Sequence, residues 1–273
     1  MTLTKNNPPK KILNYLIDFV LIAAFFVGVY FVGNYFYQRY VTHQEEVATT
    51  QLVKKVVKVN KKRNVAKTNK MPSEGNINID WNKLKSINPK IKAWIYIPGT
   101  NINYAVLQGS DNLFYLHHNE YDQPSISGQI FFDYRNAPDF SDKNTFIYGH
   151  YMYDGTRFAD LTKYFDSTFY NAHRHVYVYT QTKKYMGTVF AVQSNSGLSK
   201  AHTLSFKNNN DMTDYIEYLK SRSVVKDTIP TKDISKILTL WTCTEKPSTG
   251  DAGQTIDINK ARTFVSVSLK EVN

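Results

Sequence analysis

The chain has 273 residues, and its Lys and Arg outnumber Asp and Glu to give a formal net charge of +11. Most of that excess precedes residue 71, so the remainder is nearly neutral, which argues against a nucleic-acid-binding protein. The single cysteine excludes an intramolecular disulfide and a cysteine-based zinc site. This length and composition predict one globular domain with an anchor.

Residues 12–37 form a run rich in Leu, Ile, Val and Phe, with one acidic residue, Asp18. As a helix the run would reach about 39 Å, enough to cross a hydrocarbon core of about 30 Å. It is too long for the apolar part of a signal peptide, and no A-x-A-like cleavage site follows. We therefore expect a single transmembrane helix at 12–37 rather than a buried core helix. Because lysines precede it, residues 1–11 are expected to be cytoplasmic and the rest of the chain extracellular.

Residues 38–75 are expected to form a basic stalk and linker. A loose apolar stripe begins after residue 41 and gives way to a Lys-rich run ending at Lys70. This pattern favours a stalk helix that frays into a solvated spacer, and the alternative is a segment held near anionic lipid or wall polymers. Pro72 and Gly75 mark the boundary of a domain at 76–273.

The rest of the chain predicts many short strands with a few inserted helices, a pattern typical of a β-barrel. Expected strands lie at 93–97, 103–107, 128–133, 144–148, 176–180, 185–193, 237–241 and 262–269. Expected helices lie at 80–87, in a short turn after Asp111, at 156–171 and at 211–221.

Three reactive side chains stand at the ends of these strands. The strand 237–241 leads to Cys243, the strand 262–269 opens on Arg262, and the strand 144–148 is followed by His150. A hairpin built from the last two strands would place Cys243 close to Arg262. A thiol, an imidazole and a guanidinium together indicate nucleophilic chemistry on a carbonyl group.

Each of these residues also has a simpler interpretation. Taken alone, Cys243 fits an inert core thiol, Arg262 a solvated charge at a strand edge, and His150 a turn residue. The paired histidines at 117–118 and at 173 and 175 have no carboxylate cluster or second thiol at ligand spacing. We therefore expect neither a metal nor a cofactor.

The T-L-W-T-C stretch at residues 239–243, with His150 and Arg262 in order and context, resembles the catalytic motif of the sortases, and further segments resemble class B. These segments are WIYIPGT at 94–100, NYAVLQ at 103–108, DNLFYL at 111–116, GQIFFDYRN at 128–136 and YGHYMYDGTRF at 148–158. The likeness extends over residues 79–269.

This resemblance implies a mainly β fold, a closed eight-stranded sortase-type barrel with inserted helices. It also implies a membrane-anchored cysteine transpeptidase of Gram-positive bacteria, which cleaves a C-terminal sorting signal after Thr, holds a thioacyl enzyme and passes the acyl group to an amine. Cys243 would be the nucleophile, His150 the proton donor, and Arg262 the group that binds the substrate or the oxyanion. Thr242 and Thr244 are further candidates beside the oxyanion, Thr244 through its backbone N–H.

Two departures from the class B pattern concern the substrate. Trp241 stands where the class commonly has a small serine, and the loop from Cys243 to Arg262 is longer than usual. They favour a pilin as the protein substrate and a pilin lysine as the acceptor, with anchoring of surface proteins to a peptidoglycan cross-bridge as the alternative. An alternative of another class is a membrane-anchored, non-catalytic binding module in which Cys243 is structural.

Overall fold

The computed structural model describes residues 10–59 and 77–272, and it divides into two compact units, Met1–Glu45 and Glu46–Asn273. Helix α1 (Lys10–Val56) begins in the first unit and ends in the second. It is long and apolar enough to cross a membrane, and its most apolar stretch is not buried within the protein. This is compatible with a single membrane anchor. Residues 60–75 of the expected basic stalk and linker lie outside the described residues.

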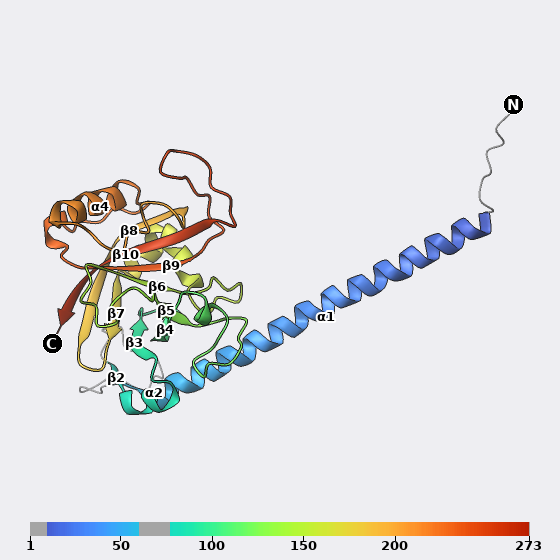
Figure 1. Ribbon diagram of the computed structural model, residues 1–273, viewed down its shortest axis with the longest axis horizontal. Helices are drawn as coiled ribbons and strands as arrows, with labels where there is room; N and C mark the ends of the chain where they lie inside the picture. The colour runs from blue at the N-terminus through green and yellow to red at the C-terminus, as the bar shows by residue number, and fades with distance from the viewer. Residues whose placement is uncertain (1–9, 60–76, 273) are drawn as a thin grey trace. The chain divides into compact units, whose positions relative to one another are not determined.

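The second unit is built on a closed barrel of eight strands (Figure 1), as expected. The strands follow one another around it in the order β10, β8, β7, β3, β4, β5, β6 and β9. Their bounds are β3 Ile91–Tyr96, β4 Asn103–Leu107, β5 Ile130–Phe132, β6 Asn144–Tyr148, β7 His175–Tyr179, β8 Lys184–Ser196, β9 Ile237–Cys243 and β10 Ala261–Val272. Neighbours are antiparallel except for two parallel pairs, β4 with β5 and β6 with β9.

Two apolar clusters hold the barrel together. One takes alternate residues from all eight strands, including Ile95, Val106 and Leu240, as the filled interior of a small barrel requires. The other packs the opposite faces of the strands against helices α2 (Trp81–Ile87) and α4 (Asn209–Ser221). Both helices agree with the sequence prediction.

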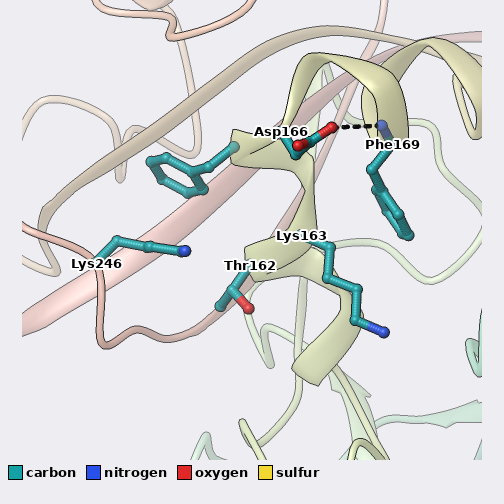
Figure 2. A pocket seen from close by; sticks show the side chains of 6 residues that line it. Thr162, Lys163, Asp166, Phe169 and Lys246 are labelled. Atoms are coloured by element: carbon teal, nitrogen blue, oxygen red, sulfur yellow. Dashed lines mark hydrogen bonds between the residues drawn. The ribbon is translucent and has the colours of Figure 1, made fainter.

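The prediction of a single helix at 156–171 is wrong, because the chain forms two shorter helices there. These are the 3-10 helix η2 (Ala159–Phe165) and the α-helix α3 (Ser167–Ala172). Asp166 between them has an extended backbone, and its side chain accepts hydrogen bonds from the backbone N–H groups of Thr168 and Phe169, the latter at 3.0 Å (Figure 2). An aspartate that caps a new helix ends the preceding one, although the apolar spacing continues through it.

The second unit begins upstream of the boundary expected at residue 76. A short strand that follows α1 directly, β1 (Val57–Val59), pairs with β2 (Ile77–Ile79). Leu52 and Val56, from the end of α1, are buried in the same apolar cluster as β2. The last turns of α1 therefore pack into the core of this unit.

Two short 3-10 helices complete the described elements, η1 (Phe114–Leu116) and η3 (Thr231–Asp233). The Asp111 carboxylate accepts hydrogen bonds from the backbone N–H groups of Leu113 and Phe114, both at 2.8 Å. The short turn expected after Asp111 is therefore η1, which lies between β4 and β5.

Candidate active site

The parallel pairing of β6 with β9 brings His150 and Cys243 to the same end of the barrel. Tyr148 is the partner of Trp241 in this pair, and the backbone N–H of Gly149 donates to the carbonyl of Trp241 at 3.1 Å. Each reactive residue lies two positions beyond a paired residue of its strand. His150 and Cys243 therefore follow the same paired position of two neighbouring strands, so their backbones lie at one end of the barrel.

The antiparallel pairing of β9 with β10 adds the guanidinium. Arg262 lies directly opposite Cys243, as the predicted hairpin requires. Directly opposed residues point to the same face of a sheet, with their Cβ atoms about 4.5 to 5.5 Å apart. The structure thus brings Cys243, His150 and Arg262 together at one edge of the barrel.

Cys243 is exposed, although the strand that carries it is mostly buried. The apolar residues Ile237, Leu238 and Leu240 fix β9 in the core, and the thiol emerges where the strand ends. It is the only cysteine of the chain. An exposed position does not fit the alternative in which the thiol is an inert part of the core.

His150 is held by a backbone carbonyl. Its Nε2 lies 2.8 Å from the carbonyl oxygen of Leu116, the last residue of η1. Because a carbonyl can only accept, Nε2 carries the hydrogen, and Nδ1 remains to accept or release a proton. Burial lowers the pKa of His150, and the nearby charges of His117 and Arg157 lower it further, although the bond to Leu116 raises it. The sequence did not reveal this acceptor, because any residue supplies a carbonyl.

Arg262 is fixed from two sides. Its Nη1 donates to the backbone carbonyl oxygens of Asn259 at 2.9 Å and Ala261 at 2.8 Å. The centre of its guanidinium lies 5.9 Å from the centroid of the Trp241 ring. The guanidinium is therefore oriented by its own loop and by the neighbouring strand.

The two threonine candidates differ in position. Thr242 is buried and adjacent to Cys243 along β9, so its side chain points to the opposite face of the sheet from the thiol. The Thr244 hydroxyl accepts a hydrogen bond from the backbone N–H of Lys246 at 3.0 Å. Of the two residues, only Thr244 keeps a group, its backbone N–H, that directly follows the nucleophile.

The β9–β10 loop (residues 244–260) is tied to the strands and helices around it, which the sequence did not predict. The Asp251 carboxylate accepts hydrogen bonds from the Tyr218 hydroxyl at 2.6 Å, the Asn195 side chain at 2.8 Å and the backbone N–H of Lys200 at 2.9 Å. Burial raises the pKa of Asp251, but these hydrogen bonds outweigh it and hold the pKa below its usual value. The loop is thus fastened over β8 and α4.

A pocket beside the same loop does not include the three reactive side chains. It is formed by residues of η2 and α3 together with Lys246 (Figure 2). Neither Cys243, His150 nor Arg262 lines it.

Comparisons with known proteins identify the family and the fold. The family model described as Sortase domain matches residues 95–258. Sortase B of Listeria monocytogenes is 38% identical over 173 residues, which cover 63% of this chain and 70% of that protein. The crystal structure of Clostridium perfringens sortase B superimposes with a TM-score of 0.61 at 34% identity, over 71% of this chain and 100% of that one. For Staphylococcus aureus sortase B the TM-score is 0.62 at 29% identity, over 71% and 87% of the two chains.

The closed eight-stranded barrel and the match to the Sortase domain define a cysteine transpeptidase of the sortase type. The chain belongs to the sortase family, and within it to class B.

Proposed function

We propose that Cys243, His150 and Arg262 carry out the transpeptidation of this class B sortase. The observation that supports this assignment best is the exposed, solitary thiol directly opposite Arg262, on a strand that runs parallel to the one leading to His150. Each residue type suits its step: a thiolate attacks, an imidazolium protonates the leaving amine, and a guanidinium binds the oxyanion or the substrate backbone.

In the first half of the reaction the Cys243 thiolate adds to the carbonyl carbon of the substrate threonine. The C–N bond to the next residue then breaks, and the amine leaves with a proton from Nδ1 of His150, because Nε2 is occupied by Leu116. In the second half an acceptor amine attacks the thioester and gives its proton to His150, and the thiolate leaves. Arg262 would donate to the oxygen that becomes negative in both halves, with the Thr244 N–H beside it.

We propose a C-terminal sorting signal of an exported protein as the acyl donor. A Staphylococcus aureus sortase B has been solved as a substrate complex, and a sortase B has been solved in complex with triglycine, which carries a free amine. For the present chain we favour pilin polymerisation, with a pilin lysine as the acceptor, because Trp241 and the long β9–β10 loop alter the surroundings of the thiol. Anchoring to peptidoglycan is the second candidate, and the triglycine complex of the relative favours it.

We also propose the arrangement at the membrane. Residues 1–11 would be cytoplasmic, 12–37 would cross the bilayer and the catalytic domain would be extracellular, because Lys5, Lys10 and Lys11 precede the apolar run. The sequence predicts a stalk at 38–75 and the catalytic domain at 76–273. Because Leu52 and Val56 pack into its core, we extend the proposed catalytic domain back to Glu46.

The test is the fate of the acyl group in the native host. Cys243→Ala should keep the fold and abolish both transfer and thiol labelling, since the chain has no other cysteine. Mass spectrometry of the wild-type product identifies the acceptor. Threonine joined to a pilin lysine supports polymerisation, threonine joined to a cross-bridge supports anchoring, and only a free threonine carboxylate would overturn transpeptidation. Turnover retained in Cys243→Ala would overturn the assignment of the nucleophile.

A further inference from the structure

Trp241 lies in an aromatic cluster that joins three parts of the fold. Its ring meets Tyr148 of β6 edge to face at 4.6 Å between centroids, and it stacks on Phe264 of β10 at 5.9 Å with 22° between the planes. His202, from the loop between β8 and α4 (residues 197–208), lies 5.0 Å away at 32°. These contacts restrict the indole in its position beside the reactive edge.

The same indole faces the Arg262 guanidinium. Trp241 pairs with Phe264 across the two strands, so Arg262 is its diagonal neighbour. The 5.9 Å between the guanidinium and the ring centroid is within the range of a cation–π interaction, for which Trp is the best aromatic partner. Arg262 lies opposite Cys243, so the indole is one of the contacts, with the Asn259 and Ala261 carbonyls, that hold the guanidinium near the end of β9.

Gly197 shows how tightly the β8–α4 loop covers this pair. A Cβ atom on Gly197 would lie 3.0 Å from Cζ2 of Trp241 and 3.6 Å from Cγ of Arg262. The backbone N–H of Gly197 donates to the carbonyl of Lys260 at 3.3 Å, close to Arg262 in the chain. The loop backbone therefore packs directly on both side chains, with no space for a larger residue unless they shift.

We propose that Trp241 is a positioning residue for Arg262. The indole provides the surface on which the guanidinium rests, and Gly197 closes over both, so the charge stays beside Cys243 before substrate binds. The inference rests on the proposed role of Arg262 in the reaction. It adds a residue that contacts neither the nucleophile nor the leaving group in the proposed mechanism.

The position of the charge can be measured without a peptide substrate. The full chain in detergent is treated with an anionic methanethiosulfonate, which carries a sulfonate, and with a cationic one, which carries a trimethylammonium group. Both react with the same Cys243 thiolate, so the ratio of the two rates does not depend on the thiolate fraction. The rate with the anionic reagent divided by the rate with the cationic one reports the electrostatic potential at the thiol. A guanidinium beside the thiol raises this ratio, because it attracts the anionic reagent and repels the cationic one.

In Arg262→Gln we expect the ratio of anionic to cationic rates to fall by about fivefold. Trp241→Ala should give most of that fall, whereas Trp241→Phe, which keeps a ring, should restore most of the wild-type ratio. The double variant Trp241→Ala/Arg262→Gln should be no lower than Arg262→Gln alone. Trp81→Ala is the matched control, because Trp81 is also a partly buried tryptophan against the same apolar cluster but lies on α2.

An unchanged ratio in Trp241→Ala would overturn the proposal, as would an equal fall in Trp81→Ala. If Trp241→Ala unfolds, Gly197→Ala and Trp241→Leu give the same test. Gly197→Ala should lower the ratio in the wild-type protein, where it displaces the indole, but not in Trp241→Leu, where the indole is absent. An equal fall in the wild-type and Trp241→Leu backgrounds would contradict the proposal. An unchanged ratio in Arg262→Gln would also overturn the proposal, because it would show that the Arg262 charge does not lie beside the thiol. Because the readout needs no transfer activity, failure of the proposed function is recognised separately, by the loss of peptide turnover.

Discussion

At the scale of single residues, the site depends on the protonation of one imidazole. Burial is the main cause that lowers the pKa of His150, and burial also lowers the pKa of His202. A histidine in the unfolded chain titrates at about 6.5, so between the folded value and about 6.5 the unfolded chain binds more protons. The contribution of each neutral imidazole to the free energy of unfolding is therefore fully present above about pH 6.5. It is lost as the pH falls through the pKa that the imidazole has in the folded protein.

We predict that the free energy of unfolding falls on acidification from about pH 7 to pH 5, and that His150→Gln makes this fall shallower. Gln keeps a donor for the Leu116 carbonyl but does not titrate. Denaturant unfolding at a series of pH values measures the slope. His175→Gln, at an exposed position of β7, is the control. A slope in His150→Gln equal to that of the wild type would show that this imidazole is not buried in its neutral form.

The sequence predicts only those site residues whose chemistry is in their side chains. Cys243, His150 and Arg262 were identified because each ends or begins an apolar strand and matches the sortase pattern. The partner of His150 was not, because it is the carbonyl of Leu116. The sequence contains one residue related to this contact, Gly128. Its close approach to the Leu116 carbonyl can be recognised only in the folded structure, where residue 128 lies beside η1.

At the scale of elements, η1 supplies the carbonyl that orients His150, and Gly128 allows the next strand to approach it. Gly128 has φ +55°, and a Cβ there would lie 2.5 Å from the Leu116 carbonyl oxygen and 2.7 Å from that of Tyr115. Both atoms are backbone, so a side chain on residue 128 must displace η1. The displaced carbonyl would no longer accept from His150.

We predict that Gly128→Ala lowers kcat on a sorting-signal peptide by about tenfold or more, because a correctly held general acid contributes at least that much. The bond to Leu116 raises the pKa of His150, so its loss should move the titration of His150 further down. NMR titration of the His150 ring measures this shift, and steady-state kinetics measure kcat.

Gly155→Ala separates this effect from backbone strain. Gly155 also has a positive φ, +84°, but the nearest atom to its Cβ would be the Asn101 side-chain nitrogen, at 3.6 Å. Both variants should lose about 1 kcal/mol for the left-handed backbone. Only Gly128→Ala should shift the His150 titration, and an equal shift in Gly155→Ala would contradict the role of η1.

The features of the fold that the sequence did not predict depend on contacts that local spacing along the chain does not record. Local spacing predicted one helix over 156–171, yet Asp166 caps a second helix with its own side chain. Local spacing also gave the strands β6 and β9 but not their parallel pairing, which joins residues far apart in the chain. The resemblance to sortases implied a closed eight-stranded barrel but not this pairing, because periodicity along a strand contains no information on its neighbours.

At the scale of the whole molecule, the start of the folded unit is the point where the sequence was least informative. The sequence predicts Leu52 and Val56 as part of the loose apolar stripe of a stalk, yet they are 3% and 0% exposed in the core. The β1 and β2 strands that follow are too short to recognise by alternation. The apolar side chains that secure this end of the unit therefore precede the Pro and Gly residues taken as its boundary.

We predict that a soluble fragment of residues 46–273 is more stable than one of residues 76–273. Removing the buried Leu52 and Val56 should cost about 3 to 6 kcal/mol, at about 1.5 to 3 kcal/mol for each fully buried aliphatic side chain. The shorter fragment also loses the Thr49 hydroxyl, which accepts from Nη1 of Arg157 at 3.3 Å, and Arg157 itself is 1% exposed. Denaturant unfolding of both fragments measures the difference.

The double variant Leu52→Ala/Val56→Ala within residues 46–273 tests the cause. If burial of these two side chains is what stabilises the unit, the variant should approach the stability of the shorter fragment while retaining the Thr49 to Arg157 hydrogen bond. Equal stability of the two wild-type fragments would show that the end of α1 is a passive spacer and would move the start of the catalytic domain back to residue 76. A lower stability of the shorter fragment would mean that the helix expected to anchor the enzyme also completes its fold.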